Sequence, residues 1–202
     1  MRKLTIAYHR PGMEFEVERL NLLVKVAHKL TGIEKDVVFE LKPLDEVSPR
    51  DGNCILLMPI RGGHALSLEE KGVKVKTIPL QVTVAAIASR ASGYSSIILV
   101  YHQPKRVEAL ALALDSLNHI AEMLRGLGFE IHLLEYGGSL SGAARGSCIV
   151  VPLTVCKGRI SEWARRLASS IKCSYAGVLL DYGFWLIASW IALEASRSIE
   201  CI

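Results

Sequence analysis

The sequence lacks paired cysteines, although it contains five of them in 202 residues. No two follow the Cys-x-x-Cys pattern, which argues against a zinc knuckle. Three of the cysteines lie in or beside predicted apolar strands, where we expect inert core thiols. An odd, scattered set also fits the reducing environment of the cytoplasm. The five are Cys54, Cys148, Cys156, Cys173 and Cys201.

The sequence also has little net charge, no targeting signal and no long apolar run. Its formal charge of +4 favours an anionic ligand but is far from the dense basic surface of a nucleic-acid binder. Residues 1–6 run directly into a predicted strand and lack the apolar region of a signal peptide. The most apolar segment, residues 184–193, is too short to cross a bilayer and is expected to be a buried or interface helix. We therefore expect a cytoplasmic protein that binds neither nucleic acid nor a membrane.

Apolar residues are abundant, at half of the chain. This balance suits parallel sheets that are covered on both faces. Short apolar runs alternate with segments in which apolar residues recur at helical spacing. They predict strands at 4–8, 37–41, 54–60, 73–78, 96–101, 129–134, 148–155 and 178–180. The predicted helices are 13–30, 66–71, 82–91, 107–124, 160–171 and 184–196.

The predicted elements form an internal repeat. A Tyr-His dipeptide ends the first strand of each part, at His9 and at His102, an offset of 102 − 9 = 93 residues. A strand-end proline recurs at the same offset, and two motifs in one register are hard to obtain by chance. We predict an α/β protein of two tandem halves, residues 1–92 and 93–202. Each half is expected to hold a mainly parallel four-stranded sheet flanked by helices.

Two histidines directly follow strands of the first half. One is His9, and the other is His64, which follows the glycine pair Gly62 and Gly63. In open α/β sheets, ligands bind at the carboxyl ends of the strands. If the two strands are neighbours, the imidazoles converge on one divalent cation and leave open coordination positions. Imidazole suits zinc, cobalt, nickel and iron, and it can accept a proton near neutral pH.

Three glutamates begin the predicted helix 13–30. Their expected role is to complement the helix dipole and to face solvent, with the first also a candidate third metal ligand. They are Glu14, the candidate ligand, and then Glu16 and Glu18.

Each half is expected to have two motif loops at the carboxyl edge of its sheet. All four of these loops carry an arginine or a lysine. The offset of 93 residues places Lys157 at the position of His64, so the second half keeps one motif histidine. We expect the cations to hold a polycarboxylate ligand, with arginines gripping carboxylates in bidentate fashion. Arg106 directly follows Lys105, one of these cations. The expected ligand-binding residues are Arg10, Arg61, Gly62, Gly63, His102, Lys105, Lys157 and Arg159.

These motifs carry a family resemblance. The strand-His loop and the later strand-Gly-Gly-His resemble the class II chelatases, specifically the sirohydrochlorin cobaltochelatases of cobalamin and sirohaem synthesis. In that family a short form is a single half that dimerises, and a long form fuses two halves, which here span essentially the whole chain. The resemblance implies flavodoxin-like, chelatase-like halves. It also implies that His9 and His64 bind the metal and assist removal of the pyrrole protons.

The chain departs from the family pattern in two loops. The family usually has His-Gly-Ser after its first strand, whereas this chain has His9-Arg10-Pro11 and His102-Gln103-Pro104. In the second half, Cys156-Lys157-Gly158 stands where Gly-Gly-His is expected. The second half is therefore expected to be a partner lobe whose motif residues face the substrate.

The hypothesis from the sequence is a chelatase that inserts a divalent metal into sirohydrochlorin or a related polycarboxylate tetrapyrrole. The metal is its substrate, with cobalt favoured and nickel or iron as alternatives. Two other functions stay open: a non-catalytic tetrapyrrole- or metal-binding relative, and a small-molecule enzyme that shares only the architecture. A monomer and a homodimer are both compatible with the sequence. The histidines off the motif loops are expected to be surface or flanking residues: His28, His119 and His132.

Overall fold

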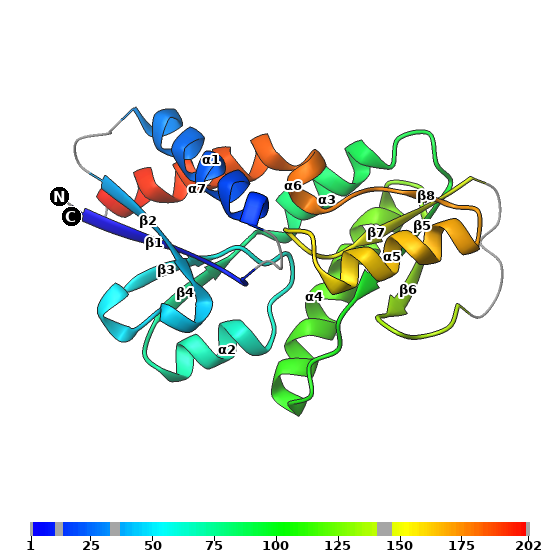
Figure 1. Cartoon of the computed structure of the whole chain (residues 1–202), viewed down its shortest axis with the longest axis horizontal. Coiled ribbons are helices and arrows are strands. Elements are labelled where there is room, and N and C mark those ends of the chain that lie inside the picture. Colours follow the sequence, from blue (N-terminus) through cyan, green and yellow to red (C-terminus); the bar gives the residue numbers. More distant parts are fainter. Residues whose placement is uncertain (1, 11–13, 33–36, 141–146, 201–202) are drawn as a thin grey trace.

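The computed structural model describes residues 2–10, 14–32, 37–140 and 147–200 (Figure 1). Within them the chain forms two separate four-stranded sheets. Every pairing between neighbouring strands is parallel. The predicted fold class, two parallel four-stranded sheets flanked by helices, is therefore confirmed.

The first sheet has the strand order β2-β1-β3-β4. The central strand β1 is apolar and buried along most of its length because helices cover both of its faces. The strands are β1 (Arg2–Tyr8), β2 (Val37–Pro43), β3 (Asn53–Leu56) and β4 (Lys74–Thr77).

The second sheet repeats this order as β6-β5-β7-β8. Its strand β5 is buried from Ser96 to Val100 in the same way. The strands are β5 (Ser96–Tyr101), β6 (Glu130–Glu135), β7 (Cys148–Pro152) and β8 (Ser174–Tyr175).

The helices are shared between the two sheets (Figure 1). Helices α1 (Glu14–Thr31) and α7 (Phe184–Glu200) pack together on one face of the first sheet, and α2 (Gly63–Glu70) covers the other face. Helices α3 (Leu80–Arg90) and α4 (Val107–Gly126) cover one face of the second sheet, opposite α5 (Arg159–Ser170). The helix that follows each set of strands thus completes the core of the other sheet.

The two segments that pack on the sheet of the other half, α3 and the segment formed by α6 (Leu179–Tyr182) and α7, contact each other closely. The short helix α6 leads into α7 through Gly183, which lies against α3. A Cβ atom at Gly183 would lie 2.9 Å from the carbonyl oxygen of Leu179 and 3.1 Å from the Cβ of Ala86. Only glycine therefore lets the helices from the two halves approach this closely.

The last predicted strand is wrong. Val178 is the N-cap of α6 and residues 179–180 begin that helix, and the fourth strand of the sheet is the short β8 that precedes them. Three consecutive buried apolar residues fit a strand and a buried helix turn equally well. The strand predicted at 54–60 likewise ends earlier, at Leu56.

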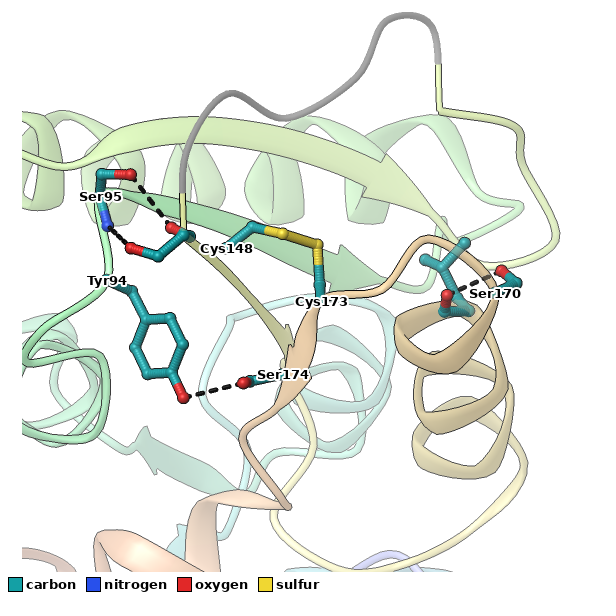
Figure 2. Close-up of a disulfide and its surroundings, with 8 residues drawn as sticks. Tyr94, Ser95, Cys148, Ser170, Cys173 and Ser174 are labelled. Atoms are coloured by element: carbon teal, nitrogen blue, oxygen red, sulfur yellow. Dashed lines mark hydrogen bonds between the residues drawn. A yellow bond between two sulfur atoms is a disulfide. The ribbon is translucent and has the colours of Figure 1, made fainter.

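The prediction of free thiols is also wrong for two cysteines. Cys148, at the start of β7, forms a disulfide with Cys173, which precedes β8, across a Cα–Cα distance of 5.0 Å (Figure 2). The parallel pairing of β7 with β8 brings these positions together. Close by, the hydroxyl of Tyr94 donates a hydrogen bond of 2.8 Å to Ser174 Oγ. Cys54 and Cys156 are free.

The pairing of the strands changes the offset that relates the two halves at the second motif. The offset of 93 residues holds for the first strands, because Leu99 occupies the place of Ile6 (99 − 6 = 93). Ile6 pairs with Ile55, however, and Leu99 pairs with Val151, so the next strands are related by 151 − 55 = 96 residues.

The helices after those strands follow the same offset of 96 residues. Gly62 before α2 and Gly158 before α5 are both N-cap residues with extended backbone. Lys157 therefore occupies the place of Arg61, and Ile160 occupies the place of His64.

No helix among the described residues is long and apolar enough to cross a membrane. The apolar segment at the end of the chain lies within α7 and packs against α1 and the first sheet. Its hydrophobic character is thus explained by the core that it completes.

Candidate functional site

Two imidazoles meet at the carboxyl edge of the first sheet. His9 directly follows β1, and His64 is the second residue of α2, after β3. Because β1 and β3 are parallel neighbours, their carboxyl ends lie side by side. The two ring centroids are 5.3 Å apart, with their planes inclined by 57°. This separation suits two ligands of one cation, for which zinc–nitrogen distances are about 2.0–2.1 Å.

His9 is exposed, and a backbone contact selects its tautomer. Its Nδ1 lies 3.2 Å from the carbonyl oxygen of Arg10. A carbonyl oxygen only accepts hydrogen bonds, so Nδ1 is the donor and Nε2 keeps its lone pair. A hydrogen bond of this kind commonly orients a metal-binding imidazole.

His64 is half-buried and is held in its neutral form. Burial lowers its pKa below the ordinary value of 6.5, and electrostatic repulsion from the neighbouring imidazoles of His9 and His102 lowers that pKa further. An imidazole that stays neutral at pH 7 can bind a metal ion or accept a proton. The influence of His102 shows that the second half comes close to the histidine pair.

The histidine pair has no further protein ligand beside it among the described residues. No group of three or more His, Cys, Asp or Glu side chains is arranged there to hold a metal. Glu14, the candidate third ligand from the sequence, is exposed at the start of α1 and belongs to no such group. Two protein ligands leave most coordination positions open, which suits a metal that is passed on.

The glycine pair brings α2 against the second half. A Cβ atom at Gly63 would lie 3.6 Å from the Cβ of Ala109, and one at Gly62 would lie 3.7 Å from the Cβ of Ala113. Both alanines belong to α4. Neither glycine has a positive φ, so a strained turn is not the reason for their presence. A Cβ atom at either position would make ordinary van der Waals contact, so α2 begins close against α4 beside His64.

The arginines near the histidine pair are already paired with carboxylates. Arg10 Nε donates to Asp45 at 3.2 Å and its Nη2 to Glu46 at 2.5 Å. Arg61 Nη2 lies 2.6 and 2.7 Å from the two oxygens of Glu69. Both guanidinium groups therefore have carboxylate partners within the first half.

Arg106 is paired across the junction between the halves. It donates two hydrogen bonds, of 3.0 and 2.7 Å, to the carboxylate of Glu70 on α2. With the alanine contacts of Gly62 and Gly63, this bidentate pair fixes α2 against the start of α4.

Around His102 the second half carries aromatic rings. The His102 ring lies 6.4 Å from the Tyr136 ring, and Tyr136 packs edge-to-face on Trp163 of α5 at 5.6 Å. These aromatic residues lie at the carboxyl edge of the second sheet. With Ile160 in the place of His64, the second half does not repeat the imidazole pair.

Lys157 is directed toward α1 of the first half. Its Nζ lies 5.2 Å from the centre of the Phe15 ring, and its backbone N–H donates to Glu16 Oε2 at 3.2 Å. The remaining expected cations, Lys105 and Arg159, are exposed and have no ion-pair partner among the described residues.

Glu16 is the residue that the sequence prediction placed wrongly. It was expected to face solvent, but it is fully buried, and Arg19 Nη1 donates to it at 3.0 Å. Arg19 also donates to Asp181 of α6 at 2.8 Å, so the carboxylate lies in a network that joins both halves. Burial and the Glu16 charge raise the pKa of the Cys156 thiol to about 12. The internal repeat contained a signal for this burial. At the offset of 93 residues Glu16 corresponds to Ala109, and Ala109 lies against Gly63 of the other half.

The histidines outside the motif loops bond to their own surroundings. His28 Nε2 lies 3.0 Å from the carbonyl oxygen of Val37, and His119 Nδ1 lies 2.9 Å from that of Asp115. His132 lies beside Glu130 on β6. None of these contacts involves the motif loops.

Comparison with known proteins identifies related folds only. No protein-family model matches the sequence, and no curated protein matches it. Among solved structures, the cobalt complex of the sirohydrochlorin chelatase SirB from Bacillus subtilis subspecies spizizenii aligns with a TM-score of 0.64 at 13% identity, over 98% of this chain and 95% of that chain. SirB from Bacillus subtilis with Fe3+ aligns with a TM-score of 0.64 at 10% identity, over 100% of this chain and 98% of that chain. The chain therefore has the chelatase-like fold of SirB, with a pair of imidazoles at the carboxyl edge of its first sheet.

Proposed function

We propose that this protein is a metal chelatase that inserts a divalent metal into sirohydrochlorin or a related polycarboxylate tetrapyrrole. The observation that carries the proposal is the His9–His64 pair, with ring centroids 5.3 Å apart. The fold likeness to SirB supports it, since those structures hold cobalt and Fe3+. Cobalt is the proposed metal, with nickel and iron as alternatives. The cytoplasm stays the proposed location, but the Cys148–Cys173 disulfide removes the cysteine pattern as an argument for it.

The pair has two tasks in this reaction. His9 Nε2 and one nitrogen of His64 hold the incoming cation while its remaining positions stay open to water or to the macrocycle. Insertion releases two protons from the pyrrole nitrogens as the metal–nitrogen bonds form. His64 is neutral at pH 7 because its pKa is lowered. As the cation passes from the imidazoles to the macrocycle, the lone pairs freed on His64 and on His9 Nε2 can each accept one of the two protons.

The test is metal insertion into sirohydrochlorin, followed by the change in its absorbance spectrum under anaerobic conditions. We expect the wild type to insert Co²⁺. The His64→Ala and His9→Ala variants should be at least about 100-fold slower, because a positioned general base typically contributes at least that factor to a rate. His119→Ala, on the outer surface of α4, is the matched control. Equal rates for the wild type and His64→Ala would refute the proposal. Tight tetrapyrrole binding without insertion would select the non-catalytic alternative.

A further inference from the structure

The two halves differ in how their cations are neutralised. In the first half, Glu69 pairs with Arg61, and the next residue, Glu70, pairs across the junction with Arg106 of the second half. At the offset of 96 residues, α5 carries Arg165 and Arg166 in the places of these two glutamates. The carboxylates that neutralise arginines beside the histidine pair therefore have no counterpart in the second half.

Three cations near the carboxyl edge of the second sheet consequently lack a carboxylate partner among the described residues. They lie in the loops after β5 and β7 and at the start of α5. The loop after β5 also reaches the histidine pair, because a Cβ atom at Gly62 would lie 3.7 Å from Pro104 Cγ. The three cations are Lys105, Lys157 and Arg159.

Lys157 is fixed in place while its ammonium group stays unneutralised. Glu16 accepts the backbone N–H of Lys157, and its other oxygen accepts from Arg19. The ammonium group lies instead over the face of Phe15, where a cation is held without being neutralised. Glu16 is thus a positioning residue for this loop.

The arginine pairs of the first half are poor sites for an anionic ligand. A ligand carboxylate at Arg10 or Arg61 has to displace a carboxylate that already accepts hydrogen bonds from that guanidinium. One exposed ion pair then replaces another, with little net gain. At an unpaired cation the same carboxylate adds a charge-assisted hydrogen bond.

We propose that the anionic side chains of the ligand are bound by the second half, through Lys105, Lys157 and Arg159. This inference rests on the proposed function and adds an orientation to it. The ligand's carboxylates face the second half, while its metal-binding centre faces His9 and His64. Arg10 and Arg61 hold loops of the first half and leave ligand recognition to the other half.

The test uses uroporphyrin I, a tetrapyrrole with eight carboxylates, titrated without metal and followed by its absorbance and fluorescence. We expect Lys105→Gln, Lys157→Gln and Arg159→Gln together to raise its Kd about 30-fold or more, at roughly threefold or more for each exposed contact. The charge-matched control Lys25→Gln/Lys29→Gln/Arg125→Gln, on exposed faces of α1 and α4, should change the Kd less than twofold. Salt should weaken binding of the wild type more than binding of the triple variant.

A second arm compares the two halves directly. Arg10→Gln/Arg61→Gln should raise the Kd less than threefold, and an effect as large as that of the triple variant would overturn the inference. So would a triple variant that binds like the wild type. Metal insertion is measured in parallel: a wild type that inserts metal while the triple variant binds normally refutes only this inference. A wild type that neither binds uroporphyrin nor inserts metal refutes the proposed function and the inference together.

Discussion

The disulfide between Cys148 and Cys173 should contribute much of the stability of the second half. It spans 25 residues, from the start of β7 through α5 to the residue before β8. Closing a loop of this length removes about 12 cal/mol/K of entropy from the unfolded chain, or about 3.5 kcal/mol at 25 °C. In a chain of this size each kcal/mol shifts Tm by about 2–4 °C, so we expect reduction to lower Tm by about 7–14 °C.

The assay is thermal unfolding followed by circular dichroism, with and without a phosphine reductant. The Cys148→Ser/Cys173→Ser variant should melt at the temperature of the reduced wild type and should not respond to the reductant, which makes it the matched control. Thiol titration of the unfolded protein should find two more reactive thiols after reduction. Because the disulfide lies at the amino end of β7, away from the carboxyl edge, metal binding should be unchanged.

Two results would refute this reasoning. An oxidised and a reduced wild type that melt within about 2 °C of each other would show that the loop constraint contributes little. A thiol count that is unchanged by reduction would show that β7 and β8 do not bring these cysteines together. The second result would also question the pairing that places β8 at the edge of the sheet.

Three further predictions concern titratable groups. His64 should titrate below 6.5 by NMR of the metal-free protein, and His102→Gln should raise its pKa by removing a nearby positive charge; an unchanged pKa would contradict the proximity of the two rings. The pKa of Asp51 is strongly lowered although the group is buried, because Lys42, Ser48 and Lys3 donate hydrogen bonds to it. Its charge therefore stabilises the fold above the unfolded pKa near 3.8, and this stability is lost as pH falls through the folded pKa. Asp51→Asn should cost about 3 kcal/mol at pH 7 in denaturant titration, and the difference from the wild type should shrink below pH 4; a constant difference would contradict it. Finally, with a pKa of about 12 against 9.0, Cys156 should react with iodoacetamide at pH 8 roughly a thousandfold more slowly than an ordinary cysteine, and Glu16→Gln should speed the reaction. Alkylation at the ordinary rate would contradict this.

The sequence predicted the features that local pattern determines. The apolar runs of β1 and β5 cannot be satisfied outside a covered sheet, and their flanking helices show clear helical spacing. A histidine directly after each of these strands has to lie at the carboxyl edge of its sheet. The approach of His9 to His64 follows once β1 and β3 are neighbours.

Features that depend on pairing between distant segments were not predictable from local pattern. The apolar stripe of α7 shows that one face is buried but does not say that the partner is the first sheet. The prolines at 59 and 152 suggested one offset for the whole repeat. Pro152 lies within β7, whereas Pro59 lies beyond the end of β3, so the strand register differs by three residues.

Glu16 shows a different limit of sequence reasoning. A glutamate in the first turn of a helix is usually a solvated dipole complement, and Glu14 and Glu18 fit that description. Glu16 is buried only because the loop after β7 and helix α6 close over it from the second half. Its environment is created by residues more than 140 positions away, such as Lys157.

The exchange of helices explains why a site between the halves can hold its parts in a fixed relation. Helix α2 begins beside His64 and abuts α4, whose N-terminus is paired with α2 through Arg106 and Glu70. On the other side, α1 begins after the His9 loop and is tied to the Lys157 loop through Glu16. Each half thus places the start of a helix from its own motif region against a motif loop of the other half. The contacts of Gly62 and Gly63 with α4 involve the shortest side chains, and Glu16 accepts from a backbone N–H, so main-chain packing helps to set the distance between the imidazole pair and the loops that carry the unpaired cations.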